Sequence, residues 1–292
     1  MRFSPSSLSP WLGATVGLVS TVSVATAPAI AQTLNVRVTP AAPQLGETIS
    51  VFITGASGES APMVQMGGQT YPAFAIGGNR YRALLPTSPL EAAGGRTIQV
   101  QDASGQQQTL GVTVRGRSFP TQRITLRGGG SNATQYELDR VAAFKTIVTP
   151  EKHWQGPLVR PSAGRVSTIY GVRRYYNGVF AENYYHRGVD YAAGRGTPIL
   201  APAAGYVRLV DRENNGFRVH GNTVGIDHGQ GVLSIMLHLN SISVREGEFV
   251  EAGQRIGTMG STGASTGPHL HWGLYVHGVA IDPVPWRFEG LE

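Results

Sequence analysis

Apolar and polar residues alternate with a period of two along the first third of this chain. The apolar positions that keep this spacing are Leu34, Val36, Val38, Ile49, Val51, Ile53, Tyr81, Ala83, Ile98, Val100, Val112 and Val114. Side chains two residues apart share one face of a strand, so the pattern predicts short strands with one buried face. Gly, Pro and Asn separate the runs, for example at residues 77–79, and predict tight turns.

Several short strands joined by regular turns are typical of a small β-sandwich. We therefore expect residues 33–117 to form a sandwich of the immunoglobulin-like kind. This region carries no cluster of catalytic residue types. We interpret it as a spacer or a binding module, and a purely structural role as the simpler of the two.

A helical pattern follows the stretch RGGGSN at residues 127–132, which predicts a flexible joint. Thr134 and Glu137 have the spacing of a capping box, and Pro150 ends the pattern. The residues expected on one stripe of this helix are Leu138, Val141, Ala142 and Lys145. We interpret residues 118–153 as a linker with one short helix, a packing or linking element that need not carry chemistry.

The rest of the chain is again rich in strand patterns. The predicted strands are residues 206–210, 223–226, 232–239, 250–256 and 270–276. A hairpin turn is predicted at residues 227–231, where the sequence is DHGQG. The whole chain is therefore expected to be all-β, with an N-terminal sandwich, one short linking helix, and a C-terminal antiparallel sheet over residues 154–292.

The composition agrees with an all-β protein rich in turns. Of 292 residues, 39 are Gly and 18 are Pro, and charged residues make up 14%. The formal net charge is +6, but no run of Lys and Arg favours a nucleic acid partner. The chain contains no cysteine, so disulfides and thiolate metal ligands are excluded. Any metal must be bound by His and carboxylate side chains.

Residues 1–31 have the features of a secretory signal peptide. Arg2 precedes an uncharged stretch, and Ala29-Ile30-Ala31 fits the small-x-small rule for cleavage. The alternative is a membrane anchor, but the stretch is rich in Ser, Thr and Gly and only weakly apolar. We therefore expect an exported mature protein that begins at Gln32, with no stable insertion in the membrane.

Candidate chemistry is concentrated in the second half of the chain. His269 and His271 would project from one face of a strand, so both can act at one site. His186 and Asp190 are four residues apart, but the nearby glycines favour an extended or irregular segment over a helix. Each pattern alone has a simpler explanation, as surface histidines or as a hydrogen-bonded core residue in the case of His238. Imidazole and carboxylate together suit Zn²⁺.

Read together, these motifs resemble the lysostaphin/LytM-type zinc endopeptidases. The resemblance covers residues 155–287. It rests on HRGVD (186–190), LHL (237–239) and GPHLH (267–271), and on GTPILAPAAGYV, GNTVGIDHGQGV, VREGEFVEAGQRIG and IDP in the same order. The family fold is a compact antiparallel β-sheet with a groove across it, which agrees with the predicted strands.

The resemblance implies a role for each matched residue. His186, Asp190 and His271 match the family's zinc ligands, and His238 and His269 match its two catalytic histidines that do not bind metal. One departure is Met236, where the family often has a tyrosine and where the floor of the groove would change. His153, His220, His228 and His277 match no metal or catalytic position, and turns explain Asp227 and Asp282. The tyrosines of residues 175–185 either pack under a loop or form a wall of the groove.

The resemblance implies a zinc-dependent endopeptidase, with Zn²⁺ as cofactor, that cuts peptide cross-bridges of peptidoglycan in the periplasm or cell wall. Direct D-alanyl cross-links are favoured over glycine bridges, because no separate wall-targeting module is apparent. One alternative is a catalytically inactive LytM-type regulator that activates other wall hydrolases. Such a regulator is expected to lack a ligand, and none is missing. A pure wall-binding module is the third possibility, and the complete set of five site residues argues against it.

Overall fold

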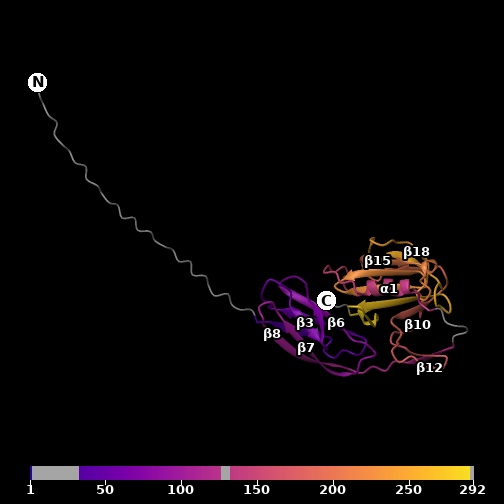
Figure 1. Ribbon diagram of the computed structural model, residues 1–292, viewed down its shortest axis with the longest axis horizontal. Helices are drawn as coiled ribbons and strands as arrows, with labels where there is room; N and C mark the ends of the chain where they lie inside the picture. The colour runs from indigo at the N-terminus through magenta and orange to yellow at the C-terminus, as the bar shows by residue number, and fades with distance from the viewer. Residues whose placement is uncertain (2–32, 126–131, 290–292) are drawn as a thin grey trace. The chain divides into compact units, whose positions relative to one another are not determined.

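The computed structural model describes Met1 and residues 33–125 and 132–289 (Figure 1). The predicted signal peptide, apart from Met1, and nearly all of the predicted joint at residues 127–132 lie outside the described residues. Within them, strands dominate and the single α-helix is α1 (Gln135–Lys145), which confirms the all-β prediction. No helix of the described part is long and apolar enough to cross a membrane.

The first described region is a β-sandwich of two four-stranded antiparallel sheets, with strand orders β1-β2-β6-β5 and β4-β3-β7-β8. The strands are β1 (Asn35–Thr39), β2 (Thr48–Thr54), β3 (Met63–Met66), β4 (Gln69–Pro72), β5 (Phe74–Ala75), β6 (Arg80–Pro86), β7 (Gly94–Gln101) and β8 (Gln107–Val114). Apolar side chains at every second position, such as Ile49, Val51 and Ile53, are fully buried between the sheets. The β-sandwich is confirmed, and its immunoglobulin-like kind stays a prediction.

The second region is built on an eight-stranded antiparallel sheet of order β10-β13-β21-β17-β16-β15-β19, with β22 paired to β21. Its strands are β10 (Arg165–Thr168), β13 (Val189–Ala192), β15 (Gly205–Asp211), β16 (Thr223–Gly229), β17 (Val232–Leu237), β19 (Phe249–Val250), β21 (His269–Val276) and β22 (Val279–Ile281). The central strands β16 and β17 are buried along their whole length. The near-continuous apolar sequence of β17, VLSIML, is what a strand covered on both faces requires.

Two smaller sheets flank this core, with orders β12-β11-β9 and β14-β20-β18. Their strands are β9 (Thr121–Ile124), β11 (Arg173–Tyr176), β12 (Val179–Phe180), β14 (Pro198–Leu200), β18 (Leu239–Ile242) and β20 (Arg255–Met259), and the short 3₁₀ helices are η1 (Glu213–Asn215) and η2 (Pro285–Arg287). β9 and β11 pair in parallel, so a strand from the predicted linker extends a sheet of the second region.

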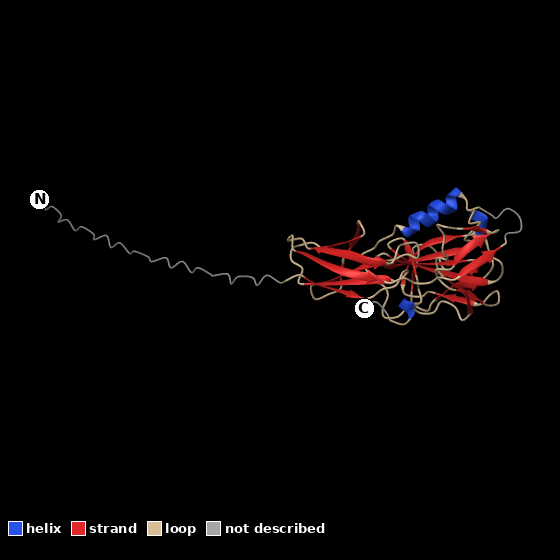
Figure 2. Cartoon of the chain, turned by 90° about the horizontal axis from the view of Figure 1, so that it is seen from below, coloured by secondary structure: helices blue, strands red, loops and turns tan. Residues whose placement is uncertain are grey.

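Helix α1 begins as predicted, because the Thr134 side chain accepts a hydrogen bond from the Glu137 amide. The predicted stripe is wrong, since Leu138 is 50% exposed and Ala142 is exposed as well. The buried residues of α1 are Glu137, Val141 and Phe144. The helix packs on β15, and Figure 2 shows it lying along the strands of the second region. The buried face of α1 therefore includes the carboxylate of Glu137.

Three predicted strands have different limits in the structure. β16 continues to Gly229, and only Gln230 and Gly231 form the hairpin turn. The predicted strand at residues 232–239 breaks at His238, whose φ is +64°. The predicted strand at residues 250–256 is divided, because residues 251–254 form the turn between β19 and β20.

The predicted domain boundaries at residues 33–117, 118–153 and 154–292 remain predictions. Residues 32–292 form one compact unit. Arg117 forms an ion pair with Asp282, with 2.7 Å between the nitrogen and the carboxylate oxygen, and the Arg82 guanidinium donates to the Gln230 side chain at 2.6 Å. Residues of the sandwich are therefore in direct polar contact with residues of the second region.

Candidate metal centre

Two of the candidate metal ligands lie side by side in the central sheet. Asp190 of β13 pairs directly with His271 of β21 in the antiparallel register. Opposite residues of such a pair have side chains on the same face of the sheet. The backbone ladder therefore brings the carboxylate and the imidazole together.

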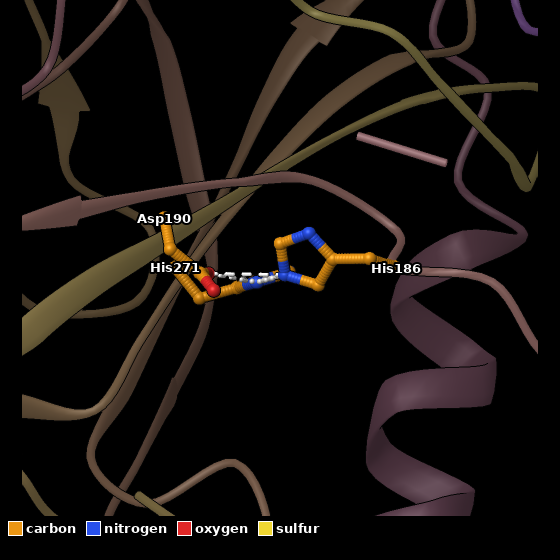
Figure 3. A group of neighbouring side chains, drawn as sticks. All are labelled: His186, Asp190 and His271. Carbon is orange, nitrogen blue, oxygen red and sulfur yellow. Dashed lines mark hydrogen bonds and ion pairs between the residues drawn. The ribbon is translucent and has the colours of Figure 1, made fainter. Parts of the chain in front are cut away.

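His186 completes the group from the segment that precedes β13. Its Nε2 lies 3.0 Å from Asp190 Oδ1 and 3.0 Å from His271 Nδ1, and His271 Nδ1 lies 2.9 Å from Asp190 Oδ1. Figure 3 shows the three side chains pointing toward one another. All three are buried, with 9% exposure or less. The structure thus brings together the three residues that the family resemblance placed as ligands.

The backbone fixes which nitrogen of His186 faces the group. His186 Nδ1 lies 2.8 Å from the Ile169 carbonyl oxygen, which can only accept a hydrogen bond. Nδ1 therefore carries the proton, and the Nε2 lone pair faces Asp190 and His271. A hydrogen bond of this kind on the outer nitrogen is the usual support of a metal-binding histidine.

Burial and hydrogen bonding act in opposite directions on the charges of this group. Burial lowers the pKa of His271 to about 4, although Asp190 raises it. Burial raises the pKa of Asp190, but the adjacent rings of His186 and His271 outweigh it and hold the pKa below its ordinary value. A neutral imidazole and an ionised carboxylate are the forms that bind a metal ion.

These residues fit a zinc ion in donor type, number and spacing. Two imidazole nitrogens and one carboxylate oxygen are a usual ligand set for catalytic zinc, which keeps one further position open. Donor atoms about 2.0 to 2.2 Å from a tetrahedral ion lie roughly 3.3 to 3.6 Å apart. The donor atoms here are 2.9 to 3.0 Å apart, so a small outward movement would admit the ion.

The other two candidate residues, His238 and His269, form a pair of their own. Their ring centroids are 4.7 Å apart. His238 Nδ1 donates to the Thr262 carbonyl oxygen at 2.8 Å, and His269 Nδ1 donates to the Gly267 carbonyl oxygen at 2.9 Å. In each ring Nδ1 therefore carries a proton, and Nε2 is the nitrogen left for other partners.

His238 has an unusual backbone conformation. Its φ of +64° lies in the left-handed region, which costs a non-glycine residue roughly 1 to 3 kcal/mol. Burial and the charge of His269 lower the pKa of His238 to about 3, so the ring is neutral near pH 7. A strained, buried and neutral histidine is what a site that needs a proton acceptor would contain.

The remaining histidines and Met236 have packing contacts. His228 is fully buried, and its Nδ1 donates to the Ala204 carbonyl oxygen at 2.8 Å. The ring of His153 packs edge-on against the rings of Tyr206 and Phe249. Met236 is fully buried in β17 opposite Trp272, so its side chain does not reach an exposed surface.

The tyrosines of residues 175–185 differ in burial. Tyr185 is buried, and its hydroxyl donates to the Ala280 carbonyl oxygen, so it packs under the loop. Tyr175, Tyr176 and Tyr184 are half-buried. Arg174 donates to the Tyr184 hydroxyl at 2.8 Å.

Backbone carbonyl groups were missed by reasoning from the sequence. The carbonyl groups of Ile169, Thr262 and Gly267 orient His186, His238 and His269. Every residue type has a carbonyl group, so no sequence pattern identifies these three. Only the Gly-rich and Ser-rich character of residues 260–267 indicated that a shaped loop precedes His269.

The comparisons with known proteins agree with this geometry. Residues 184–283 match the model of peptidase family M23. A crystal structure of an M23 peptidase from Pseudomonas aeruginosa is 26% identical, with a TM-score of 0.63 over 85% of this chain and 96% of that one. The chain therefore contains a domain of peptidase family M23, and the resemblance stated from the sequence is confirmed.

Two relatives are informative about function. The peptidoglycan DD-endopeptidase ShyC of Vibrio cholerae is 40% identical over 119 residues, which are 41% of this chain and 26% of that protein. The murein hydrolase activator NlpD of Salmonella dublin is 28% identical over 260 residues, which are 78% of this chain and 68% of that protein. The chain spans between 26% and 31% of the length of the first relatives it matches.

Proposed function

We propose that this protein is a zinc-dependent endopeptidase that hydrolyses peptide cross-links of peptidoglycan. The observation that carries the proposal is the arrangement of the five candidate residues. One member of the buried group of two imidazoles and a carboxylate, His271, lies on β21, and this strand begins with His269, one of the two paired histidines. Metal-ligand and acid–base groups are therefore concentrated at one end of that strand.

In this proposal His186, Asp190 and His271 hold the zinc ion. When bound, Zn²⁺ supplies Lewis-acid chemistry, because it polarises a peptide carbonyl and makes water acidic enough to act as a nucleophile near pH 7. The Ile169 carbonyl keeps His186 in the tautomer that binds metal. The backbone pairing of β13 with β21 keeps Asp190 and His271 in place.

His238 and His269 carry the proton chemistry. The chain has no HExxH motif whose glutamate would serve as the base. Because both Nδ1 atoms are occupied by carbonyl groups, the two Nε2 atoms are the groups that can take a proton or stabilise an oxyanion. The low pKa of His238 keeps the ring neutral near pH 7, so its Nε2 carries a lone pair.

The substrate class rests on the family and on the predicted export. ShyC, whose name describes a peptidoglycan DD-endopeptidase, is 40% identical to this chain over 119 residues. The predicted signal peptide would bring the mature protein to the periplasm or the cell wall, where peptidoglycan lies. Direct D-alanyl cross-links are the proposed bond, and peptidoglycan is the proposed partner.

The second candidate function is a catalytically inactive activator of other wall hydrolases. The similarity to NlpD, named as a murein hydrolase activator, favours it and extends over 78% of this chain. The complete ligand group and the histidine pair favour the enzyme, because an activator needs neither a metal ion nor a proton acceptor.

The two functions are separated by incubating purified protein with isolated sacculi. The enzyme should convert cross-linked dimers to monomers, as measured by mass spectrometry, and should create no new reducing sugar ends. Chelation should abolish this conversion, and added Zn²⁺ should restore it. No conversion by zinc-loaded protein alone, together with stimulation of a partner amidase, would establish the activator instead.

A further inference from the structure

The side chain of Glu137, in the first turn of α1, is fully buried and holds a distant loop. Its carboxylate accepts hydrogen bonds from the backbone amides of Arg218, Val219 and His220 at 2.9, 3.0 and 2.7 Å. It also accepts one from His220 Nδ1 at 2.6 Å. Burial raises the pKa of Glu137, but the hydrogen bonds from His220 and Val219 lower it below its ordinary value, so the group is ionised.

The first turn of α1 holds this loop at a second point. The hydroxyl of the N-cap residue Thr134 donates to the Gly216 carbonyl oxygen at 2.9 Å. Helix α1 therefore contacts this loop at two points, at Gly216 through Thr134 and at residues 218–220 through Glu137. Three consecutive amides converging on one carboxylate are found where the backbone must keep one conformation.

The held loop in turn supports the backbone of His238. The His220 carbonyl oxygen accepts from the His238 amide at 3.0 Å, and the Asn222 carbonyl oxygen accepts from the Leu239 amide at 3.0 Å. The left-handed φ of His238 lies between these two hydrogen bonds. A strained conformation persists only where its surroundings define it fully.

The same loop also holds the residues that orient the His238 ring. The Asn222 amide donates to the Thr262 hydroxyl at 2.9 Å, and the Ala264 amide donates to the Val219 carbonyl oxygen at 3.0 Å. The Thr262 carbonyl oxygen is the acceptor for His238 Nδ1. The candidate metal ligands use other partners, namely one another and the Ile169 carbonyl.

We propose that Glu137 is a positioning residue for His238 in the hydrolytic reaction, acting through the loop of residues 216–222. The proposal rests on the proposed function, because His238 is the group that it positions. In this proposal α1, which the sequence predicts to be a linking helix, helps to position the catalytic histidine His238. Removing α1 would remove the Glu137 carboxylate that holds the loop.

The test compares Glu137→Gln with Arg140→Gln. Glutamine keeps the shape of Glu137, but it is uncharged and has one acceptor oxygen, and its NH₂ group cannot accept the hydrogen bonds of the second carboxylate oxygen. Arg140 lies one turn further along α1 and anchors the helix to Asp211 at 3.1 Å without contacting the loop in any interaction described above. Glu137→Gln should lower kcat about tenfold with KM within twofold and zinc still stoichiometric. Arg140→Gln should lower Tm at least as much and leave kcat unchanged.

Two further measurements distinguish positioning from general destabilisation. In a His238→Ala background, Glu137→Gln should cause no additional loss of kcat, because the group it positions is absent. Amide hydrogen exchange should become faster in peptides covering residues 217–222 and 237–240 for Glu137→Gln but not for Arg140→Gln. An equal loss of kcat with and without His238, or unchanged exchange in these peptides, would overturn the proposal. If the wild-type protein hydrolyses no wall peptide, the proposed function fails, and the exchange measurement decides on the loop contact alone.

Discussion

The candidate metal ligands and the histidine pair are held in the fold in different ways. Asp190 and His271 lie opposite each other on adjacent strands of the central sheet. His238 lies at a break between β17 and β18, and His269 is the first residue of β21 after a loop. Asp190 and His271 therefore depend on direct backbone pairing inside the sheet, whereas His238 depends on contacts with the loops that contain His220 and Thr262. Changes in the loops should spare metal binding and reduce turnover.

The largest expected effect is on the ligand side. His271→Ala should remove most bound zinc and all measurable activity, because two protein ligands hold the metal poorly. Zinc content by elemental analysis and turnover on wall peptides measure both effects. The matched control is His153→Ala, since His153 packs against Tyr206 and Phe249 outside the candidate site and the variant should keep full zinc. Stoichiometric zinc in His271→Ala would show that His271 is not a ligand.

The next effect is on the histidine pair. His238→Ala or His269→Ala should leave zinc near stoichiometric and lower kcat by roughly 10²- to 10⁴-fold, as expected for a lost acid–base group. The double variant should lose less than the product of the single losses, because both groups act on one transition state. Near-normal turnover by a folded, zinc-loaded His238→Ala variant would make His238 a packing residue only.

A smaller effect is expected from substituting one glycine beside the metal ligands and one glycine beside His238. A Cβ at Gly188 would lie 2.3 Å from the Trp272 carbonyl oxygen, and one at Gly263 would lie 2.5 Å from the Gly221 amide nitrogen. Gly188→Ala should push β13 from β21 and weaken zinc binding. Gly263→Ala should displace the loop under His238 and lower kcat roughly tenfold, about 1.4 kcal/mol, with zinc retained.

Two glycines with free space provide the controls for this pair. A Cβ at Gly194 or at Gly267 meets no atom within 4 Å. Gly194→Ala and Gly267→Ala should therefore leave both zinc content and kcat close to those of the wild-type protein. Loss of zinc in Gly263→Ala would show that the two halves are not held separately.

The two halves also differ in how far the sequence could predict them. The family resemblance implied His186, Asp190 and His271 as a ligand set, and they do lie together. The break at His238 could not be predicted, because VLSIMLHL has the composition of one continuous strand and its left-handed backbone is set by residues 220 and 262. The same limit applies to Glu137. Its capping contact with Thr134 is local and was predicted, whereas its contacts with the loop span 81 residues or more.

The smallest expected effect concerns His228, a histidine held by the sheet but outside both groups. Burial lowers its pKa to about 4, although the hydrogen bond to the Ala204 carbonyl opposes this. In the unfolded chain its pKa is about 6.5, so below this pH the unfolded state binds a proton that the folded state does not. The free energy of unfolding should therefore be highest above pH 6.5 and fall as the pH falls toward 4.

This contribution should amount to roughly 1 to 2 kcal/mol between pH 7 and pH 5 for one such group. His228→Asn retains a donor for the Ala204 carbonyl but cannot titrate, so it should reduce the pH dependence by that amount while kcat at pH 7 stays unchanged. Urea unfolding of both zinc-loaded proteins at pH 5, 6 and 7 measures the difference. An identical pH dependence in the variant would mean that burial in the sheet does not keep His228 neutral in the folded protein.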